Sequence, residues 1–271
     1  MNPSEKKHFT FDQIPDLTGK VAIVTGGNAG IVLREDENIK SETGNQDVEF
    51  LHLNLKSLKS VKECAENFLA RNLPLHILIK NAGVTSNTFS LTEDGIQEEF
   101  GVNHVGHFLL TKLLLPKIKT SQPARIVNVS SRAHRYVESI IEFEKLNDPN
   151  AQDSMQRYAL SKLANILFTN ELNKRYLEEE QIYATSLHPG VVDTKLVRRN
   201  DISLSETLVS SSISTEDGAI TTLYCATSPE IEEKNFRVRY FYPFGIEGEL
   251  SSFAEDDDLA KKFWEFTENL I

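Results

Sequence analysis

Cysteine is scarce in this sequence, and its spacing excludes two kinds of structure. The chain of 271 residues has two cysteines, Cys64 and Cys225. They are too few and too far apart for a disulfide-rich secreted scaffold or a structural zinc site. No metal site is expected elsewhere, because the acidic run 255–258 is interpreted as the cap of the last helix.

Basic residues and long apolar runs are scarce as well. The chain has 29 Lys and Arg against 40 Asp and Glu, a formal net charge of −11. Such a surface repels phosphate backbones, so we expect no nucleic-acid partner. No apolar run approaches the roughly 18 residues of a membrane span, and the N-terminus lacks the apolar core of a signal peptide. We therefore expect no integral membrane span and a cytoplasmic location.

The sequence does contain an alternation of short apolar strands and longer helices. Strands that are apolar throughout are typical of a parallel sheet buried on both faces. The alternation predicts an α/β fold, a doubly wound, Rossmann-like sheet of about six strands. The expected strands are 20–25, 48–53, 75–79, 125–130, 182–188 and 237–241, and the expected helices are 57–70, 92–118, 155–179, 215–227 and 257–270.

The whole chain, residues 1–271, is expected to form one domain, with residues 1–18 as an N-terminal extension. Residues 191–214 are polar and irregular. A segment of that length in a compact domain is typical of a lid over a substrate site, and we interpret it so.

A glycine-rich turn, "TGGNAG" (25–30), follows the apolar run 21–24. Glycines let the backbone approach a ligand closely, and a following helix offers free N–H groups and positive potential to a pyrophosphate. A plain strand–turn–helix corner has the same pattern, so the turn alone does not establish a nucleotide site.

Four further motifs follow the turn in order. "YALSK" places Tyr158 and Lys162 one helical turn apart, on the same helix face. "FGVNHVGHF" contains Asn103, "RIVNVSS" ends in Ser130 and Ser131, and "LHPGVVDT" (187–194) follows the next strand. A tyrosine and lysine at this spacing occur often by chance, so the information lies in the combination and its order.

Together these motifs resemble those of the classical short-chain dehydrogenase/reductase family. Within that family the chain is similar to the retinol-dehydrogenase-like and WW-domain-oxidoreductase-like branch. The matching segments are "TGGNAGI", "NAG" (81–83), "VNHVGHFLLTKLLLP", "RIVNVSSRAH", "YALSKLANILF", "LHPGVVDTKL" and the ending "YFYPFGIEGELSSFAEDDDLAKKFWEFTENL". The likeness covers residues 20–31 and nearly all of 45–271.

The resemblance implies catalytic roles for four residues. Tyr158 would exchange a proton with the substrate oxygen, and Lys162 would favour its phenolate by Coulomb attraction and bind the nicotinamide ribose. Ser131 would donate a hydrogen bond to the substrate oxygen, although the adjacent Ser130 stays an alternative. Asn103 would bind a water of the proton relay.

The resemblance also implies a nicotinamide cofactor, NADP, with NAD as the alternative. The residues implied to bind it are Gly26, Asn28, Gly30, Ile31, Asn54, Asn81, Ala82, Gly83, Tyr158, Lys162, Pro189, Gly190 and Thr194.

Other polar residues of these motifs are interpreted as structural. His104 and His107 lie within a largely apolar helix and are expected to be buried, hydrogen-bonded histidines. His134 and Arg135 are expected in a solvated loop. Lys80 stands where the family usually has Asn and adds a charge at the floor of the cleft.

The chain is too short between Gly30 and strand 48–53 for the family's layout. Only residues 31–47 separate them, whereas helix, strand and second helix need roughly 30 residues. One βα unit is therefore missing, most simply the first helix and second strand of the Rossmann half. That strand normally carries the residue that reads the adenosine ribose, so we expect weak or absent cofactor binding.

We predict a rearrangement around the missing unit. Strand 48–53 would move beside strand 20–25, joined to it by a helix over 32–43. In that position Lys56 would reach the 2′-phosphate of NADP. If the strand does not move, Asn54 stays near the adenine ring, and the sequence leaves both placements open.

The resulting function hypothesis is an NADP-dependent oxidoreductase that interconverts a lipophilic alcohol and its aldehyde or ketone, acting as a monomer or homodimer. The alternative is a non-catalytic relative, or a shortened isoform, with impaired cofactor binding.

Overall fold

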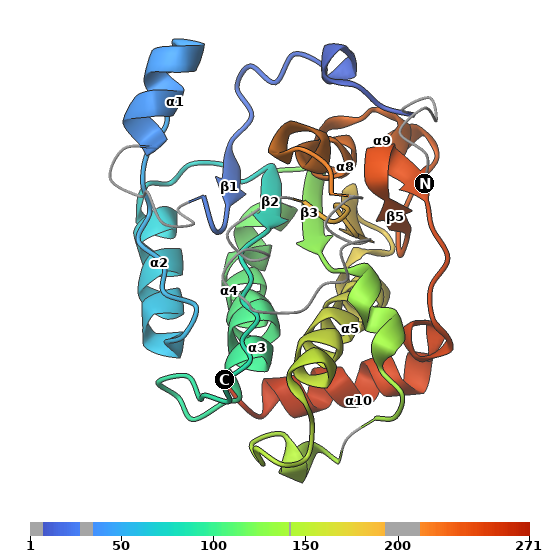
Figure 1. Ribbon diagram of the computed structural model, residues 1–271. Helices are drawn as coiled ribbons and strands as arrows, with labels where there is room; N and C mark the ends of the chain where they lie inside the picture. The colour runs from blue at the N-terminus through green and yellow to red at the C-terminus, as the bar shows by residue number, and fades with distance from the viewer. Residues whose placement is uncertain (1–7, 28–34, 141, 193–211) are drawn as a thin grey trace.

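A six-stranded sheet forms the centre of the protein (Figure 1). The computed structural model describes residues 8–27, 35–140, 142–192 and 212–271. The strands lie in sequence order; the first five are parallel and the sixth is antiparallel to the fifth. They are β1 (Ala22–Val24), β2 (Ile77–Lys80), β3 (Ala124–Val129), β4 (Ile182–Leu187), β5 (Tyr240–Tyr242) and β6 (Ile246–Glu247).

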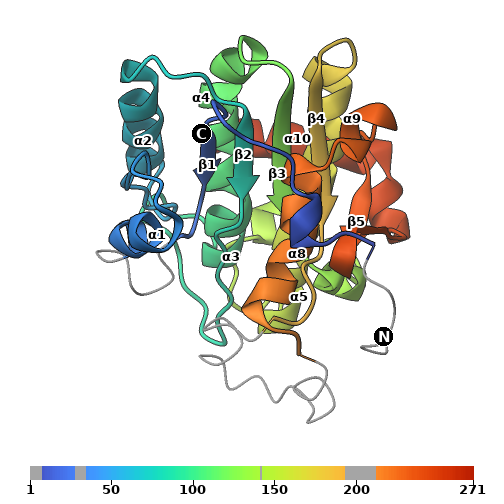
Figure 2. The same cartoon turned by 90° about the horizontal axis from the view of Figure 1, so that it is seen from above.

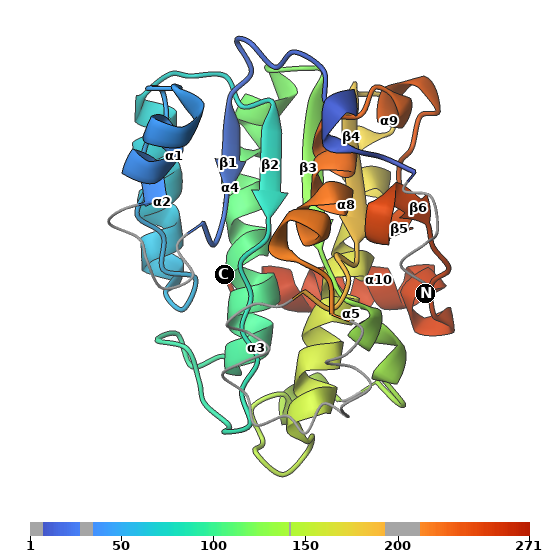
Figure 3. The same cartoon turned by 45° about the horizontal axis from the view of Figure 1, so that its top comes forward.

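Helices cover both faces of the sheet (Figures 2 and 3). Along β2 and β3 the side chains alternate: Leu78 and Ile126 pack in the cluster of α2 and α4, whereas Ile79 and Val127 pack in the cluster of α8. The helices are α1 (Glu35–Thr43), α2 (Leu58–Ala70), α3 (Glu98–Phe100), α4 (Gly106–Lys119), α5 (Ser154–Leu172), α8 (Thr215–Thr227), α9 (Glu230–Glu233) and α10 (Asp257–Glu268).

Acidic side chains cap the starts of α5 and α10. The carboxylate of Asp153 accepts a hydrogen bond from Gln156 N at 2.7 Å at the start of α5. Asp256 accepts from Leu259 N at 2.9 Å at the start of α10. Such caps satisfy backbone donors that lack a partner within the helix. The acidic run 255–258 therefore caps a helix, as predicted.

The expected α/β fold is confirmed, and five of the expected strands form. The expected helix over 92–118 is divided, because residues Gly101–Val105 form a π-helical turn between α3 and α4. The structure contains a further strand, β6, which no sequence pattern indicated. Among the described residues, no helix has the length and hydropathy that crossing a membrane would require.

The predicted move of strand 48–53 beside β1 is wrong, although the connecting helix predicted over 32–43 forms as α1 (Glu35–Thr43). Residues 48–53 form no strand, and none of their backbone groups bonds to another described residue. Leu51 and Leu53 pack against the core cluster of α2, and Glu49 is ion-paired with Arg71 at the end of that helix. These contacts hold the segment beside α2, where the strand that would have paired with it is missing.

As a result, β1 is an open edge of the sheet. Val21 O accepts from Ile77 N, and Thr25 N donates to Ile79 O at 3.0 Å. Because parallel strands bond through alternate residues, the N–H and C=O groups of Ala22 and Val24 point away from β2. Val24 is 51% exposed, so an apolar residue lies at this edge in water.

Candidate functional site

The predicted site residues gather at the carboxyl ends of the parallel strands. Gly26 follows β1, the Asn81–Gly83 segment follows β2, Ser131 follows β3 and Pro189 follows β4. In open α/β sheets this edge forms the crevice in which ligands bind. Asn28, Gly30, Ile31 and Thr194 lie outside the described residues.

Thr25 joins the glycine turn to the segment after β2. Its Oγ1 accepts hydrogen bonds from Asn81 N at 3.1 Å and Ala82 N at 3.0 Å. It also lies 2.8 Å from His107 Nε2. The His107 Nδ1 contact to a backbone carbonyl, Asn103 O at 3.0 Å, places the ring proton on Nδ1, so the Thr25 hydroxyl donates to Nε2. Sequence reasoning missed Thr25.

The backbone conformation and close packing at position 26 require a glycine. Its φ of +78° is a backbone conformation that side chains disfavour. A Cβ there would also lie 2.8 Å from Ala82 Cα. The turn and the segment after β2 are therefore in direct backbone contact.

Asn103 holds the segment after Gly83 against α5. Its Oδ1 accepts from Val84 N at 2.7 Å, and its Nδ2 donates to Val84 O and to Ser161 Oγ, each at 2.9 Å. The side chain is fully buried and lies in the π-helical turn, a feature frequent at functional sites. Its backbone carbonyl accepts from His107, as described above.

Tyr158 and Lys162 lie one turn apart on α5, as predicted. Lys162 Nζ lies 5.6 Å from the centroid of the Tyr158 ring and donates to Val129 O at 3.2 Å. Lys162 is 3% exposed, and burial lowers its pKa from 10.5 to about 8 because the charged form is disfavoured. Burial raises the pKa of Tyr158, whereas its hydrogen bond with Ser131 lowers it.

Ser130 and Ser131 are placed differently. The buried Ser130 hydroxyl donates to the backbone oxygen of Lys162 at 2.6 Å. Ser131 is partly exposed, its Oγ accepts from Ala133 N at 3.1 Å, and it contacts the Tyr158 hydroxyl. Of the two, Ser131 has the position that suits a substrate contact.

Two glycines of the site lie in close contact with their neighbours. A Cβ on Gly83 would lie 3.3 Å from both Asn103 Oδ1 and Lys162 Nζ. Gly190 has a φ of +101°, and a Cβ there would lie 2.6 Å from Ile213 Cδ1. Ile213 N donates to Val191 O at 2.9 Å, so the two ends of the predicted lid 191–214 meet beside Gly190.

At the nucleotide end of the site, the condition for the Lys56 placement is not met, because segment 48–53 does not pair with β1. Lys56, expected to reach a 2′-phosphate if strand 48–53 moved, is ion-paired with Glu98. Asn54 donates through Nδ2 to Glu93 Oε1 at 3.1 Å, and its Oδ1 accepts from Lys56 N at 3.1 Å. Both side chains are thus engaged within the protein, next to the unmoved segment 48–53.

Three histidines of the motifs are buried in the structure. His104 and His107 are buried as predicted, and burial lowers the pKa of each to about 3. His134, predicted in a solvated loop, is instead fully buried, with Nδ1 2.7 Å from Ser131 O. It therefore supports the backbone of Ser131.

Lys80 is a buried lysine of the core rather than a residue of the cleft. Its Nζ lies 3.7 Å from the centroid of the Phe168 ring on α5, and burial lowers its pKa well below 10.5. Within the described part of the chain, no group of three or more histidine, cysteine or acidic residues could hold a metal ion.

Comparisons with known proteins agree with this geometry. The family model for short chain dehydrogenases matches residues 32–203. Short-chain dehydrogenase TIC 32 A, chloroplastic, of Brassica napus is 37% identical over 94% of this chain and 90% of its own. Mouse retinol dehydrogenase 12 is 37% identical over 99% of this chain and 92% of its own, and chicken WW domain-containing oxidoreductase is 36% identical over 94% and 69%.

Solved structures show the same fold. An uncharacterized protein from Mycobacterium paratuberculosis matches with a TM-score of 0.70 and 28% identity, over 96% of both chains. NADPH-bound carbonyl reductase from chicken fatty liver matches with a TM-score of 0.57 and 22% identity, over 80% of this chain and 83% of its own.

The relatives also bear on the missing βα unit. The alignment with mouse retinol dehydrogenase 12 extends over 301 residues, whereas this chain has 271. At least thirty positions of that alignment are therefore gaps in this chain. With its motifs, its sheet and these relatives, the chain belongs to the short-chain dehydrogenase family of NAD(P)-dependent oxidoreductases.

Proposed function

We propose that this chain is an NADP-dependent oxidoreductase that interconverts a lipophilic alcohol and its aldehyde or ketone. The observation that carries the proposal is the arrangement of Ser131, Tyr158 and Lys162 at the carboxyl edge of the sheet. The lipophilic substrate is supported by the relatives named retinol dehydrogenases. The proposed form is a monomer or homodimer, and the cytoplasmic location stays a prediction.

The residues around Lys162 fit the nicotinamide end of a cofactor. Its ammonium has one hydrogen-bond partner among the described residues, Val129 O, so two of its three N–H groups are free to bind the ribose. Ala82 and Gly83 would line the cleft, and Pro189 and Gly190 would seat the carboxamide. Nicotinamide, when bound, supplies the hydride. We name NADP because chicken carbonyl reductase, of the same fold, is an NADPH complex, and NAD is its competitor.

Tyr158, Ser131 and Lys162 have separate roles in the proton transfer. The pKa of Tyr158 is raised by burial, so at neutral pH its hydroxyl is protonated and donates to the oxygen of a carbonyl substrate. Ser131 donates a second hydrogen bond to the same oxygen as charge develops. Lys162, with a pKa of about 8, is charged at pH 7 and stabilises the phenolate that forms. In the alcohol direction the phenolate accepts the proton.

The test is Tyr158→Phe, with Tyr176→Phe as the matched control. Tyr176 lies against Trp264, 5.8 Å between ring centroids, away from the site. All-trans-retinal reduction with NADPH should fall at least about 100-fold in Tyr158→Phe, because the proton donor is lost, and should be unchanged in Tyr176→Phe. Turnover that survives in Tyr158→Phe would refute the assignment.

A second candidate, a non-catalytic relative with impaired cofactor binding, is favoured by the open edge of β1. The strand that reads the adenosine ribose in this fold family would lie against that edge. Titration with NADPH followed by nicotinamide fluorescence separates the two functions: saturation supports the enzyme, and no change up to millimolar concentration supports the non-catalytic relative.

A further inference from the structure

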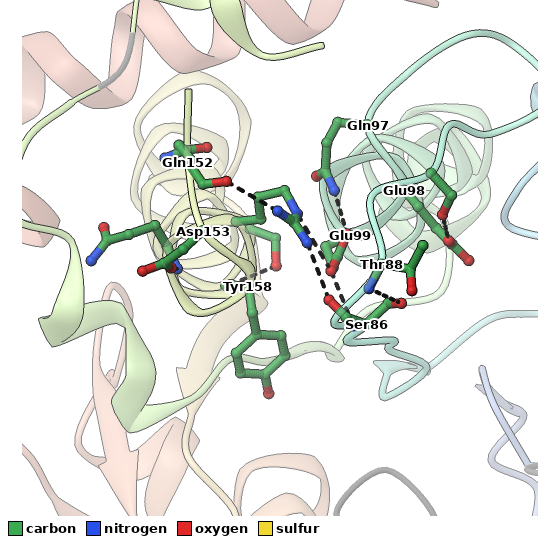
Figure 4. A network of polar contacts seen from close by, with 12 residues as sticks. Ser86, Thr88, Gln97, Glu98, Glu99, Gln152, Asp153 and Tyr158 are labelled. Carbon is green, nitrogen blue, oxygen red and sulfur yellow. Dashed lines mark hydrogen bonds and ion pairs between the residues drawn. The ribbon is translucent and has the colours of Figure 1, made fainter. Parts of the chain in front are cut away.

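A buried ion pair lies beside the turn of α5 that carries Tyr158, the proposed proton donor (Figure 4). Glu99, in α3, is fully buried, and Arg157, the residue before Tyr158 in α5, is 5% exposed. Charged side chains are almost never buried this deeply without a partner. Arg157 Nε lies 3.9 Å from Glu99 Oε1, an ion pair without a hydrogen bond between these two atoms.

Both side chains bind the same backbone unit, the peptide groups of Ser86. Glu99 Oε1 accepts from Ser86 N at 3.1 Å, and Arg157 Nη2 donates to Ser86 O at 3.2 Å. Figure 4 shows Glu99 and Ser86 together beside the segment of α5 that carries Tyr158, with the Tyr158 ring turned away from these contacts. Ser86 follows Gly83 by three residues, so the pair holds the chain just after the proposed cofactor-lining segment.

The remaining hydrogen bonds of Arg157 and Glu99 go to residues at the start of α5 and the start of α3. Arg157 Nη1 donates to Gln152 O at 3.0 Å, next to the residue that caps α5. Gln97 Nε2 donates to Glu99 Oε2, and Gln97 Oε1 accepts from Phe100 N at 3.0 Å as the cap of α3. The guanidinium thus bridges two loops that are far apart in sequence.

We propose that Arg157 and Glu99 are positioning residues: they clamp residues 84–90 to the first turns of α5 and so fix Tyr158 relative to the segment 81–83. The inference rests on the proposed function. The planar fork of arginine serves two carbonyl oxygens at once, and lysine, a single point charge, holds one of them. A displacement of the reacting group by about 1 Å can lower a rate about 100-fold.

The test is Arg157→Lys, which keeps the charge beside Glu99 and removes the fork. Arg125→Lys is the matched control, because Arg125 is also buried and ion-paired, with Glu232 at 2.7 Å, at the opposite end of the sheet. Amide hydrogen exchange of residues 84–90 and steady-state kinetics of retinal reduction are measured on each. Glu99→Gln with Arg157→Gln provides a variant without a buried unpaired charge, in case Arg157→Lys does not fold.

We expect Arg157→Lys to speed exchange in residues 84–90 at least about tenfold and to lower kcat about 10- to 100-fold with KM for NADPH unchanged. Arg125→Lys should change neither quantity. Unchanged exchange in residues 84–90 would overturn the clamp. Faster exchange with unchanged kcat would overturn the positioning role. If the wild-type protein has no activity, the proposed function and the positioning role are both refuted. Faster amide exchange of residues 84–90 in Arg157→Lys would still show that Arg157 holds this segment in place.

Discussion

Replacing Lys162 by methionine should stabilise the protein while it removes activity. The structure gives the magnitude. Burial lowers the pKa of Lys162 from 10.5 to about 8, so the folded protein holds the ammonium at pH 7 at a cost of about 3 kcal/mol. The hydrogen bond to Val129 O returns about 1 kcal/mol, and Asn165 Nδ2, 3.3 Å away, still serves that oxygen in the variant.

We therefore expect Lys162→Met to increase the free energy of unfolding by about 2 kcal/mol at pH 7. Between pH 8 and 10.5 the unfolded chain binds more protons than the folded one, so wild-type stability rises there by about 1.4 kcal/mol per pH unit, and the advantage of the variant disappears near about pH 9.5. Urea unfolding at pH 7 and pH 10, followed by the fluorescence of the single, buried Trp264, measures both values. A variant less stable than wild type at pH 7 would show that burial of the Lys162 ammonium does not destabilise the fold.

Two further predictions concern β1 and the segment after β2. The open edge predicts that the Val24 amide exchanges with solvent about 100-fold faster than that of Thr25, which donates to β2; equal protection in hydrogen-exchange measurements would show that the edge is covered. Gly83→Ala should cost about 1 kcal/mol and lower kcat about tenfold, because its Cβ displaces Asn103 Oδ1 and Lys162 Nζ; wild-type kinetics and urea midpoint would contradict the close contact.

The sequence predicts the elements whose signals are local. β2, β3 and β4 follow largely apolar runs, a pattern that indicates strands buried on both faces, and every residue of the three strands is buried. Helix α8 begins and ends where predicted, at Thr215 and Thr227, and the Ser214 side chain caps its start by accepting from Asp217 N at 3.0 Å.

Segment 48–53 shows where local reasoning fails. Its apolar pattern suits a strand, but a strand exists only with a neighbour that accepts its backbone hydrogen bonds. The missing βα unit removed that neighbour, and the contacts of Leu51, Leu53 and Glu49 with α2 keep the segment from reaching β1. The balance between those contacts and a new strand pairing cannot be estimated from sequence.

The sequence predicted the proposed catalytic residues of the site but not the residues that hold them in place. Tyr158 and Lys162 follow from a spacing on one helix, whereas the Glu99–Arg157 pair joins residues 58 apart, and nothing near either one indicates the other. His134 was misjudged because polar neighbours suggest a solvated loop, yet the chain folds back so that its ring lies against Tyr240, 5.1 Å between centroids. Thr25 was missed because one hydroxyl next to a glycine turn carries no pattern.

We expect the nicotinamide end of the site to bind its coenzyme although the adenosine end lacks a strand. Titration of the wild-type protein with NADPH, with NADH in parallel, tests it most directly. We expect saturable one-to-one binding with a Kd on the order of 0.1 mM, weak because the strand that would contact the adenosine ribose is missing. No saturable change in nicotinamide fluorescence up to several millimolar of either coenzyme, roughly the limit of specific binding, would contradict it.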